Sequence, residues 1–329
     1  MQDIFIFGGG AWGLALAHAF SQKNRVFVLS RRKLPLQAYS DVMPVLKNQD
    51  VENEYKAFQL DSNDFLSCYN QAKNPLCVIA IASAFLRNFM QQATFLDSVR
   101  KDMLILVASK GIEQGSGAFV NEILEHYFQA HNMCYLAGPS FAKEVMASLP
   151  CALVVHSSNE SLCKRYATCF PDFIKIYVQN DVIGAEIAGA YKNVIAIAGG
   201  ICDGLELGNN AKASLLSRGL VEMARFGAFF GAKQETFLGL SGSGDLFLTS
   251  NSTMSRNYRV GFGLAQGKSL TQILGELGEV AEGVYSAKSI VQISKKHNLY
   301  TPIAFEVQAI LDGGALQVGL KNLLTKKYD

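Results

Sequence analysis

The sequence has 329 residues, of which 49% are hydrophobic and 18% are charged, and 30 basic against 28 acidic side chains leave a net charge of +2. This composition excludes a largely disordered chain, and so small a net charge gives no overall attraction to nucleic acid or anionic lipid. The length is large for one hydrophobic core and predicts two domains.

The cysteines and the N-terminus indicate the compartment. The seven cysteines include no CxxC pair, are mostly flanked by apolar residues and have no clustered histidines, so we interpret them as reduced core residues. No charged segment precedes the first apolar run, and no run of 18 apolar residues occurs. We expect a cytoplasmic protein with no metal site and no membrane-spanning segment.

Short apolar runs alternate with helix-like segments in the first half of the chain, as in a doubly wound parallel sheet of the Rossmann type. The runs are DIFIF, RVFVL, PLCVIAIA, DMLILVA, MCYLA, CALVVH and DFIKIYV. The polar stretch 34–74 interrupts this alternation, and we expect it to hold a helix and irregular loops.

The amino-acid composition and the spacing of apolar residues change near residue 180. Long segments rich in Ala, Leu and Gly follow, with apolar residues three and four apart, as in helices. We therefore predict an α/β dinucleotide-binding domain over 1–180 and an all-helical substrate-binding domain over 181–329, with a cleft between them.

Gly8, Gly10 and Gly13 form a GxGxxG pattern between the first expected strand and the first expected helix. The pattern fits a tight turn or a pyrophosphate cradle. Its position at the start of a βαβ unit favours the cradle, because there the glycines make the turn, let backbone approach the phosphates and allow close helix packing.

The second expected strand ends in RVFVLSRRK, where an NAD-specific site would commonly carry an acidic residue. Arg31 and Arg32 stand there instead, and guanidinium groups suit the 2′-phosphate of NADP(H). We predict NADP(H), with NAD(H) as a usable alternative; a solvated basic loop is the competing interpretation.

Polar residues that follow strands are candidates for ligand contact, because ligands bind beyond the carboxyl ends of the strands. Lys110 follows LILVAS, and Gly138 and Ser140 follow CYLA. The competing interpretations are a surface lysine for Lys110 and a helix N-cap for Ser140.

Lys192 is the strongest single candidate. On its expected helix the same face carries small residues at 185, 188, 189, 196 and 199, with Ile195 as the main exception. A lone ammonium on so apolar a helix either reaches solvent or faces a polar pocket, and we favour the pocket.

The segment GLSGSGDLFLTSNSTMSRNYRVG combines a glycine-rich turn, Asp245 and the triplet Ser255-Arg256-Asn257 before an expected helix. Hydroxyl, guanidinium, amide and helix N-terminal N–H groups suit a phosphate or carboxylate. A capped helix beside a flexible loop is the alternative. Glu282 is a further candidate on the cofactor side.

Seven motifs, in their order along nearly the whole chain, resemble the bacterial NAD(P)-dependent glycerol-3-phosphate dehydrogenase family. They are GxGxWG, SKG, AGPSFAKE, YKNVIAIAGG, SGSGDLFLT, SRN and VAEG. The resemblance implies a Rossmann domain followed by a helical domain, and a homodimer that reduces dihydroxyacetone phosphate to sn-glycerol 3-phosphate for phospholipid synthesis. It implies that Lys192 is the proton donor or acceptor.

The resemblance also implies two sets of contacts. Residues implied to bind substrate are Lys110, Gly138, Ser140, Lys192, Asp245, Ser255, Arg256 and Asn257. Residues implied to bind the nucleotide are Gly8, Gly10, Trp12, Gly13, Arg31, Arg32, Lys110, Ala142, Arg256, Val280 and Glu282.

Two departures and two rivals remain. The family often has a proline where this chain has Ala82-Ser83, and the loops over 40–60 match poorly, which puts one cleft wall in doubt. Another β-hydroxyacid-type dehydrogenase would share the dinucleotide domain and the lysine, but the SRN triplet disfavours it. A non-catalytic dinucleotide sensor would leave Lys192 and Asp245 unexplained.

Overall fold

The computed structural model describes residues 1–38, 57–278, 280–316 and 318–319. The chain divides into two compact units. The first unit comprises 1–109, 121–136 and 140–182, and the second comprises 110–120, 137–139 and 183–329.

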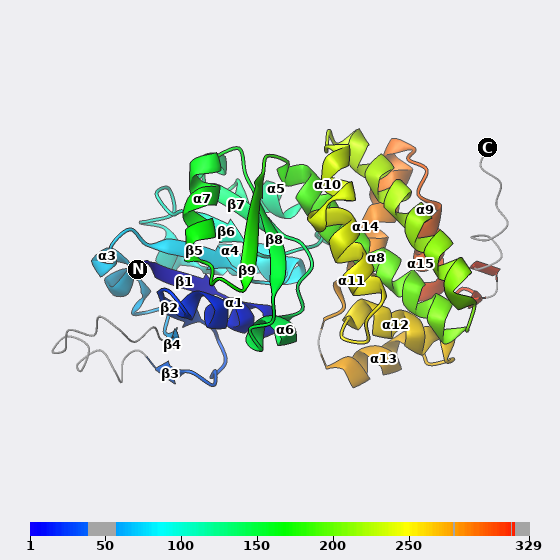
Figure 1. Ribbon diagram of the computed structural model, residues 1–329, viewed down its shortest axis with the longest axis horizontal. Helices are drawn as coiled ribbons and strands as arrows, with labels where there is room; N and C mark the ends of the chain where they lie inside the picture. Colours follow the sequence, from blue (N-terminus) through cyan, green and yellow to red (C-terminus); the bar gives the residue numbers. More distant parts are fainter. Residues whose placement is uncertain (39–56, 279, 317, 320–329) are drawn as a thin grey trace. The chain divides into compact units, whose positions relative to one another are not determined.

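A mostly parallel sheet forms the centre of the first unit (Figure 1). The strands are β1 (Asp3–Phe7), β2 (Arg25–Leu29), β3 (Gln37–Ala38), β4 (Ala57–Leu60), β5 (Leu76–Ile79), β6 (Ile105–Val107), β7 (Met133–Ala137), β8 (Cys151–His156) and β9 (Ile174–Gln179). Their order is β3-β4-β2-β1-β5-β6-β7-β8-β9, and β1 pairs in parallel with both β2 and β5. The order reverses direction at β1, which confirms the doubly wound prediction and puts the ligand-binding edge at the carboxyl ends of β1 and β5.

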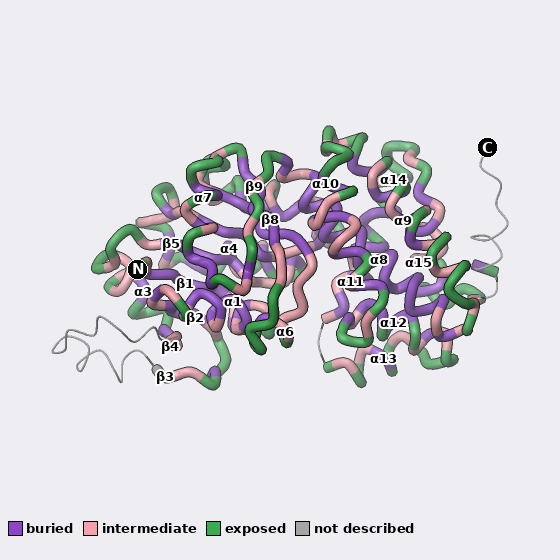
Figure 2. Tube along the Cα trace, in the orientation of Figure 1, coloured by how far each residue is buried: buried purple, intermediate pink, exposed green. Residues whose placement is uncertain are grey.

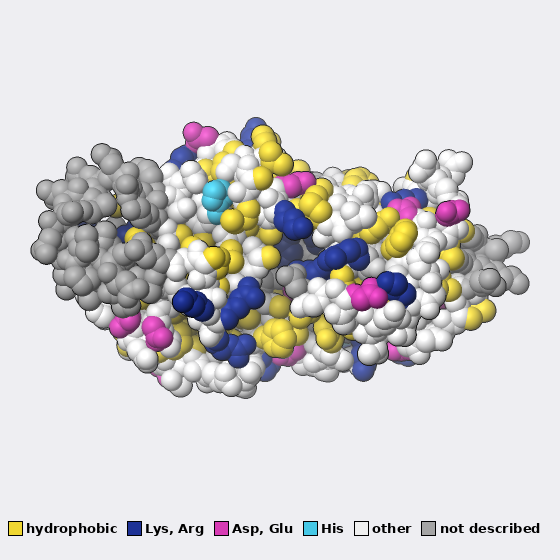
Figure 3. All heavy atoms as spheres, turned by 90° about the horizontal axis from the view of Figure 1, so that it is seen from below, with side chains coloured by type: hydrophobic (Ala, Val, Ile, Leu, Met, Phe, Trp, Pro, Cys, Tyr) yellow, Lys and Arg dark blue, Asp and Glu magenta, His cyan; other side chains and the backbone are white. Residues whose placement is uncertain are grey.

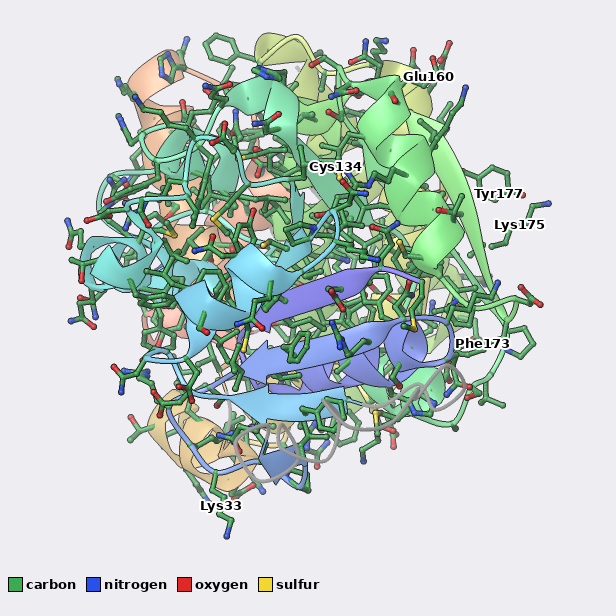
Figure 4. The ribbon with its side chains drawn as sticks, turned by 90° about the vertical axis from the view of Figure 1, so that its left-hand side faces the viewer. Lys33, Cys134, Glu160, Phe173, Lys175 and Tyr177 are labelled. Carbon is green, nitrogen blue, oxygen red and sulfur yellow. The ribbon has the colours of Figure 1, made fainter. Side chains whose placement is uncertain are left out.

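Helices connect these strands and bury their apolar faces against the sheet. They are α1 (Ala11–Ser21), α3 (Phe65–Gln71), α4 (Ser83–Gln92), α5 (Val120–Leu124), α6 (Ala142–Met146) and α7 (Glu160–Cys169), with 3₁₀ turns at Thr94–Leu96 and Ala130–Asn132. All residues of β1 are buried, as expected for a central strand covered on both faces. At the β9 edge, by contrast, Lys175 and Tyr177 project away from the sheet (Figure 4).

The prediction for 34–74 was incomplete. The expected helix is present as α3, but β4 is a strand that the sequence analysis missed, and it pairs in parallel with β2 from Val26 opposite Ala57. Only alternate residues of β4 are buried, so AFQL shows no continuous apolar run. Residues 39–56, which hold most of the poorly matched loop, lie outside the described part of the chain.

The second unit is a helical bundle, as predicted from the sequence. Its helices are α8 (Val182–Gly204), α9 (Gly208–Phe229), α10 (Gln234–Leu238), a π-helical turn (Leu240–Gly244), α11 (Asp245–Ser250), α12 (Arg256–Ala265), α13 (Leu270–Leu277), α14 (Glu282–His297) and α15 (Pro302–Leu311). Among the described residues α8 is the one helix long and apolar enough to cross a membrane, but 89% of the qualifying window is buried (Figure 2). It is the core helix of this unit.

Small residues let other helices approach α8 closely. A Cβ on Gly200 would lie 2.0 Å from the carbonyl oxygen of Tyr258, and one on Gly261 would lie 1.9 Å from that of Ile197. The backbones of α8 and α12 are therefore in direct contact, and this contact fixes the start of α12 relative to α8.

Candidate functional site

The glycine turn of the first unit links β1 to α1. Gly8 has a φ of +119°, which L residues rarely adopt, and a Cβ on Gly13 would lie 1.9 Å from the carbonyl oxygen of Gly8. Gly10 differs, because no heavy atom lies within 4 Å of the Cβ position. Two glycines are thus required by the fold, while Gly10 keeps space open beside the N-terminus of α1.

Arg32 lies against this turn. Its Nη2 donates to the carbonyl oxygen of Gly9 at 2.7 Å, and its backbone N–H donates to Ser30 Oγ at 3.3 Å. Arg31 is exposed, and Trp12 is half-buried against the core of the unit. The open space at Gly10, the N–H groups of α1 and the Arg32 guanidinium fit a nucleotide pyrophosphate.

The second unit contains a buried cluster of opposite charges. Lys192 on α8 is only 8% exposed, and its Nζ donates to Asp245 Oδ1 at 2.5 Å and to Thr249 Oγ1 at 3.1 Å. Lys110 Nζ donates to the other carboxylate oxygen, Oδ2, at 2.9 Å and lies 3.5 Å from the carbonyl oxygen of Gly138. Asp245 therefore bridges two lysines, and neither lysine extends freely into solvent.

Burial and charge set the protonation of this cluster. Burial lowers the pKa of Lys192 to about 8, and Lys110 adds to this effect while Asp245 and Glu282 oppose it. Burial alone would raise the pKa of Asp245, but the charges of Lys110 and Lys192 outweigh it and hold the pKa below its usual range. The cluster thus combines a firmly ionised carboxylate with an ammonium that can lose its proton near neutral pH.

The small face of α8 makes room for this arrangement. A Cβ on Gly189 would lie 3.3 Å from both Cγ and Cδ of Lys110, so the glycine leaves a groove for the lysine stem. Asp245 is the first residue of α11, and Thr249 follows one turn later, where its hydroxyl also donates to Asp245 Oδ1 at 3.2 Å. Thr249 was not singled out in the sequence, although its spacing of four from Asp245 was a usable signal.

The start of α12 serves two purposes. Ser255 caps the helix by accepting a hydrogen bond from the backbone N–H of Tyr258 at 3.2 Å, as in the structural alternative considered for this segment. Asn257 Oδ1 accepts from the backbone N–H of Gly283 at 2.9 Å. Arg256 is the first residue of α12, and the Asn257 bond ties its helix to the start of α14.

Glu282, the first residue of α14, is partly buried near the same cluster. Burial raises the pKa of its carboxyl group, and the charges of Arg256, Lys192 and Lys110 oppose that rise. Val280 precedes it by two residues and is half-buried. The second unit thus brings together Lys110, Gly138, Lys192, Asp245 and the starts of α12 and α14.

Two further predicted site residues, besides those at the glycine turn and after β2, belong to the first unit. Ser140 precedes α6, and Ala142 is the first residue of that helix. The N-cap of α6 is Phe141, so the interpretation of Ser140 as the cap was wrong. The interpretation of Lys110 as a surface lysine was also wrong, since its side chain is 19% exposed and ion-paired.

Figure 3 shows one face of the molecule, on which Lys and Arg side chains lie among hydrophobic and uncharged ones. In the part of the chain that the structure describes, no group of three or more His, Cys, Asp or Glu residues could hold a metal ion.

Two family models match the chain. The model described as the N-terminus of NAD-dependent glycerol-3-phosphate dehydrogenase matches residues 3–163, and the one described as its C-terminus matches residues 181–317. A glycerol-3-phosphate dehydrogenase [NAD(P)+] from Helicobacter acinonychis (strain Sheeba) is 53% identical over 327 residues, covering 99% of this chain and 100% of the relative. One from Bartonella bacilliformis is 52% identical over 325 residues with the same coverage.

Solved structures give the same result. The crystal structure of glycerol-3-phosphate dehydrogenase from Coxiella burnetii is 30% identical with a TM-score of 0.83, and the match covers 99% of each chain. The enzyme of the same name from Saccharomyces cerevisiae is 21% identical with a TM-score of 0.80 over 99% of each chain, a likeness of fold.

Proposed function

The chain belongs to the NAD-dependent glycerol-3-phosphate dehydrogenase family, and from this premise we propose that it interconverts dihydroxyacetone phosphate and sn-glycerol 3-phosphate with NAD(P)H. The membership confirms the family resemblance, the oxidoreductase class and the NAD(P) cofactor class predicted from the sequence. The observation that carries the proposal is the buried cluster of Lys192, Asp245 and Lys110.

Lys192 is the general acid in ketone reduction and the general base in alcohol oxidation. The reduced nicotinamide supplies the hydride. As negative charge develops on the carbonyl oxygen, the Lys192 ammonium stabilises it and delivers the proton. A pKa of about 8 suits both directions, because the lysine can give up its proton and regain it near neutral pH.

Asp245 and Thr249 orient the acid. The carboxylate and the hydroxyl both accept from Lys192 Nζ, which restricts the ammonium to one position. Lys110 shares the carboxylate and adds a second positive charge that favours an anionic substrate. We assign substrate contacts to Lys110, Gly138, Ser140, Lys192, Asp245, Ser255, Arg256 and Asn257, with Arg256 at the phosphate because a guanidinium binds it bidentately.

The cofactor contacts and the organisation of the chain complete the proposal. We assign 1–180 as the dinucleotide-binding domain and 181–329 as the substrate-binding domain, in a cytoplasmic homodimer. NADP(H) is the preferred cofactor, since Arg31 and Arg32 follow β2, where an NAD-specific site would commonly carry an acidic residue. The nucleotide contacts are Gly8, Gly10, Trp12, Gly13, Arg31, Arg32, Lys110, Ala142, Arg256, Val280 and Glu282.

A direct test follows the oxidation of NADPH by its absorbance with dihydroxyacetone phosphate as substrate. Matched reactions contain dihydroxyacetone or an unphosphorylated 2-oxoacid. Rapid turnover of the phosphorylated ketone alone is expected. Preference for the oxoacid would favour a β-hydroxyacid-type dehydrogenase, and tight NADPH binding without turnover of any carbonyl compound would favour a sensor.

A further inference from the structure

The start of α12, the start of α14 and the turn of α8 that follows Lys192 meet at one junction within the second unit. Asn257 Oδ1 accepts from the backbone N–H of Gly283 at 2.9 Å, and both residues are buried. The N–H of Gly283 lies in the first turn of α14, where no intrahelical carbonyl is available to it. The Asn257 side chain therefore supplies its partner from another helix.

Close packing leaves this junction little freedom. A Cβ on Gly283 would lie 2.6 Å from the carbonyl oxygen of Asn193 and 2.8 Å from Asn257 Oδ1. Asn193 is in turn held on α8 by its Nδ2, which donates to the carbonyl oxygen of Gly189 at 3.1 Å. The first turn of α14 is thus pressed against the residue that follows Lys192.

The junction joins two motifs with separate proposed ligands. Asn257 belongs to the triplet assigned to the substrate phosphate, whereas Gly283 follows Glu282 and the segment assigned to the nucleotide. The charges of Arg256 and Lys192 act on the Glu282 carboxyl group, so the two motifs also share one electrostatic environment. A movement of the start of α12 must then displace the start of α14, and the reverse.

We propose that Asn257 and Gly283 are positioning residues that hold the nucleotide-side segment 280–283 in place and couple nucleotide affinity to substrate affinity. The inference rests on the proposed function for the identity of the two ligands. Asn257 would then position the nucleotide-binding segment in addition to contacting the substrate. Gly283 would be required because a side chain there would collide with Asn193 and Asn257.

The test measures NADPH affinity by fluorescence titration, with and without sn-glycerol 3-phosphate, in the full-length protein. Asn257→Ala leaves the buried Gly283 N–H without a partner, so NADPH affinity is expected to fall by about tenfold even without substrate. Asn257→Asp retains the acceptor and is expected to restore most of that affinity, although its added charge weakens substrate binding. Gly283→Ala should weaken both ligands, because the new Cβ displaces α14.

Arg259→Ala is the matched control, since Arg259 is an exposed residue of the same helix. It should leave NADPH affinity and the melting temperature unchanged. In the wild type, sn-glycerol 3-phosphate should shift NADPH affinity, and this shift should shrink toward none in Asn257→Ala. NADPH affinity and its shift both equal to wild type in folded Asn257→Ala would overturn the coupling.

The proposed function fails separately from this inference. If the wild type shows no turnover but Asn257→Ala still binds NADPH more weakly than the wild type, the proposed reaction is refuted and the positioning role of Asn257 is supported. If Asn257→Ala does not fold, Gly283→Ala carries the test, and an NADPH affinity equal to that of the wild type in folded Gly283→Ala would count against the junction.

Discussion

The glycine turn of the first unit and the lysine-aspartate cluster of the second unit are both proposed to bind a negatively charged ligand, but with different parts of the chain. The turn uses backbone N–H groups and an absent side chain, over a short contiguous segment at Gly8 to Gly13. The cluster uses the side chains of Lys110, Lys192 and Asp245, which are far apart in the sequence. A backbone site depends on local conformation, whereas a side-chain site depends on how the helices pack.

This difference determines what a substitution does. In the turn, a methyl group added by a Gly→Ala substitution collides either with neighbouring protein atoms, which destabilises the fold, or with the bound ligand, which lowers its affinity. In the cluster, a changed charge alters the pKa values of its neighbours. The two regions can therefore be distinguished by how each responds to substitution.

The largest expected effect is on Lys192. Positioned acid–base groups typically contribute about 10² to 10⁴ in rate, so Lys192→Ala should lower kcat by at least that order while NADPH binding persists. Lys192→Met, which keeps bulk without charge, should be as inactive. Steady-state kinetics with a binding titration as control checks this; a folded variant that keeps more than about a tenth of wild-type kcat would show that the proton comes from elsewhere.

Gly13 and Gly10 should separate folding from binding within the turn. Gly13→Ala places a Cβ 1.9 Å from a backbone oxygen, and such overpacking costs about 1 to 3 kcal/mol. Gly10→Ala meets no protein atom within 4 Å, so its melting temperature should stay unchanged while NADPH affinity falls more than about tenfold. Calorimetry and fluorescence titration distinguish the two; a destabilised Gly10→Ala would contradict the role given to the open space.

The arginines after β2 should set the cofactor preference. A charge-assisted hydrogen bond contributes about 1.5 to 3 kcal/mol, so the double variant Arg31→Ala and Arg32→Ala should lose roughly 10- to 100-fold in kcat/KM with NADPH. With NADH, which lacks the 2′-phosphate, the loss should be much smaller. Kinetics with both cofactors decides, and equal losses would assign the arginines to a solvated loop or to the pyrophosphate alone.

The sequence was most informative where function depends on contiguous residues. The glycine turn, the parallel strands and the long α8 were predictable because each has a local pattern, and the small face of α8 correctly pointed to a buried Lys192. Thr249 and the bond from Asn257 to Gly283 were not found, because they depend on which helices pack together. The strand β4 was missed because half of its residues are only partly buried, so its sequence shows no continuous apolar run.

The pH dependence should follow the lowered pKa of Lys192. Reduction needs the ammonium, so its rate should be constant below pH 8 and fall about tenfold per pH unit above the pKa of about 8; oxidation needs the neutral amine and should rise through the same range. Asp245→Asn removes the charge that raises this pKa, so both profiles should move to lower pH, although the amide also weakens the orientation of Lys192. Profiles that move to higher pH would contradict the electrostatic role of Asp245.

The smallest expected effect is at Gly189, where volume and charge meet. Gly189→Ala should stabilise α8 by up to about 1 kcal/mol through helix propensity. Its Cβ, however, would lie 3.3 Å from Lys110 Cγ and Cδ, so the lysine stem must shift by a few tenths of an ångström away from α8. We expect a decrease of a few-fold in kcat, about 1 kcal/mol or less, and a slightly higher apparent pKa for Lys192, because the neighbouring positive charge moves away.

Gly275→Ala is the control, since it lies in helix α13 with no heavy atom within 4 Å of its Cβ position and tests propensity alone. Unchanged kcat and an unchanged pH profile in Gly189→Ala, with both variants folded, would show that the groove in α8 serves packing and does not position Lys110.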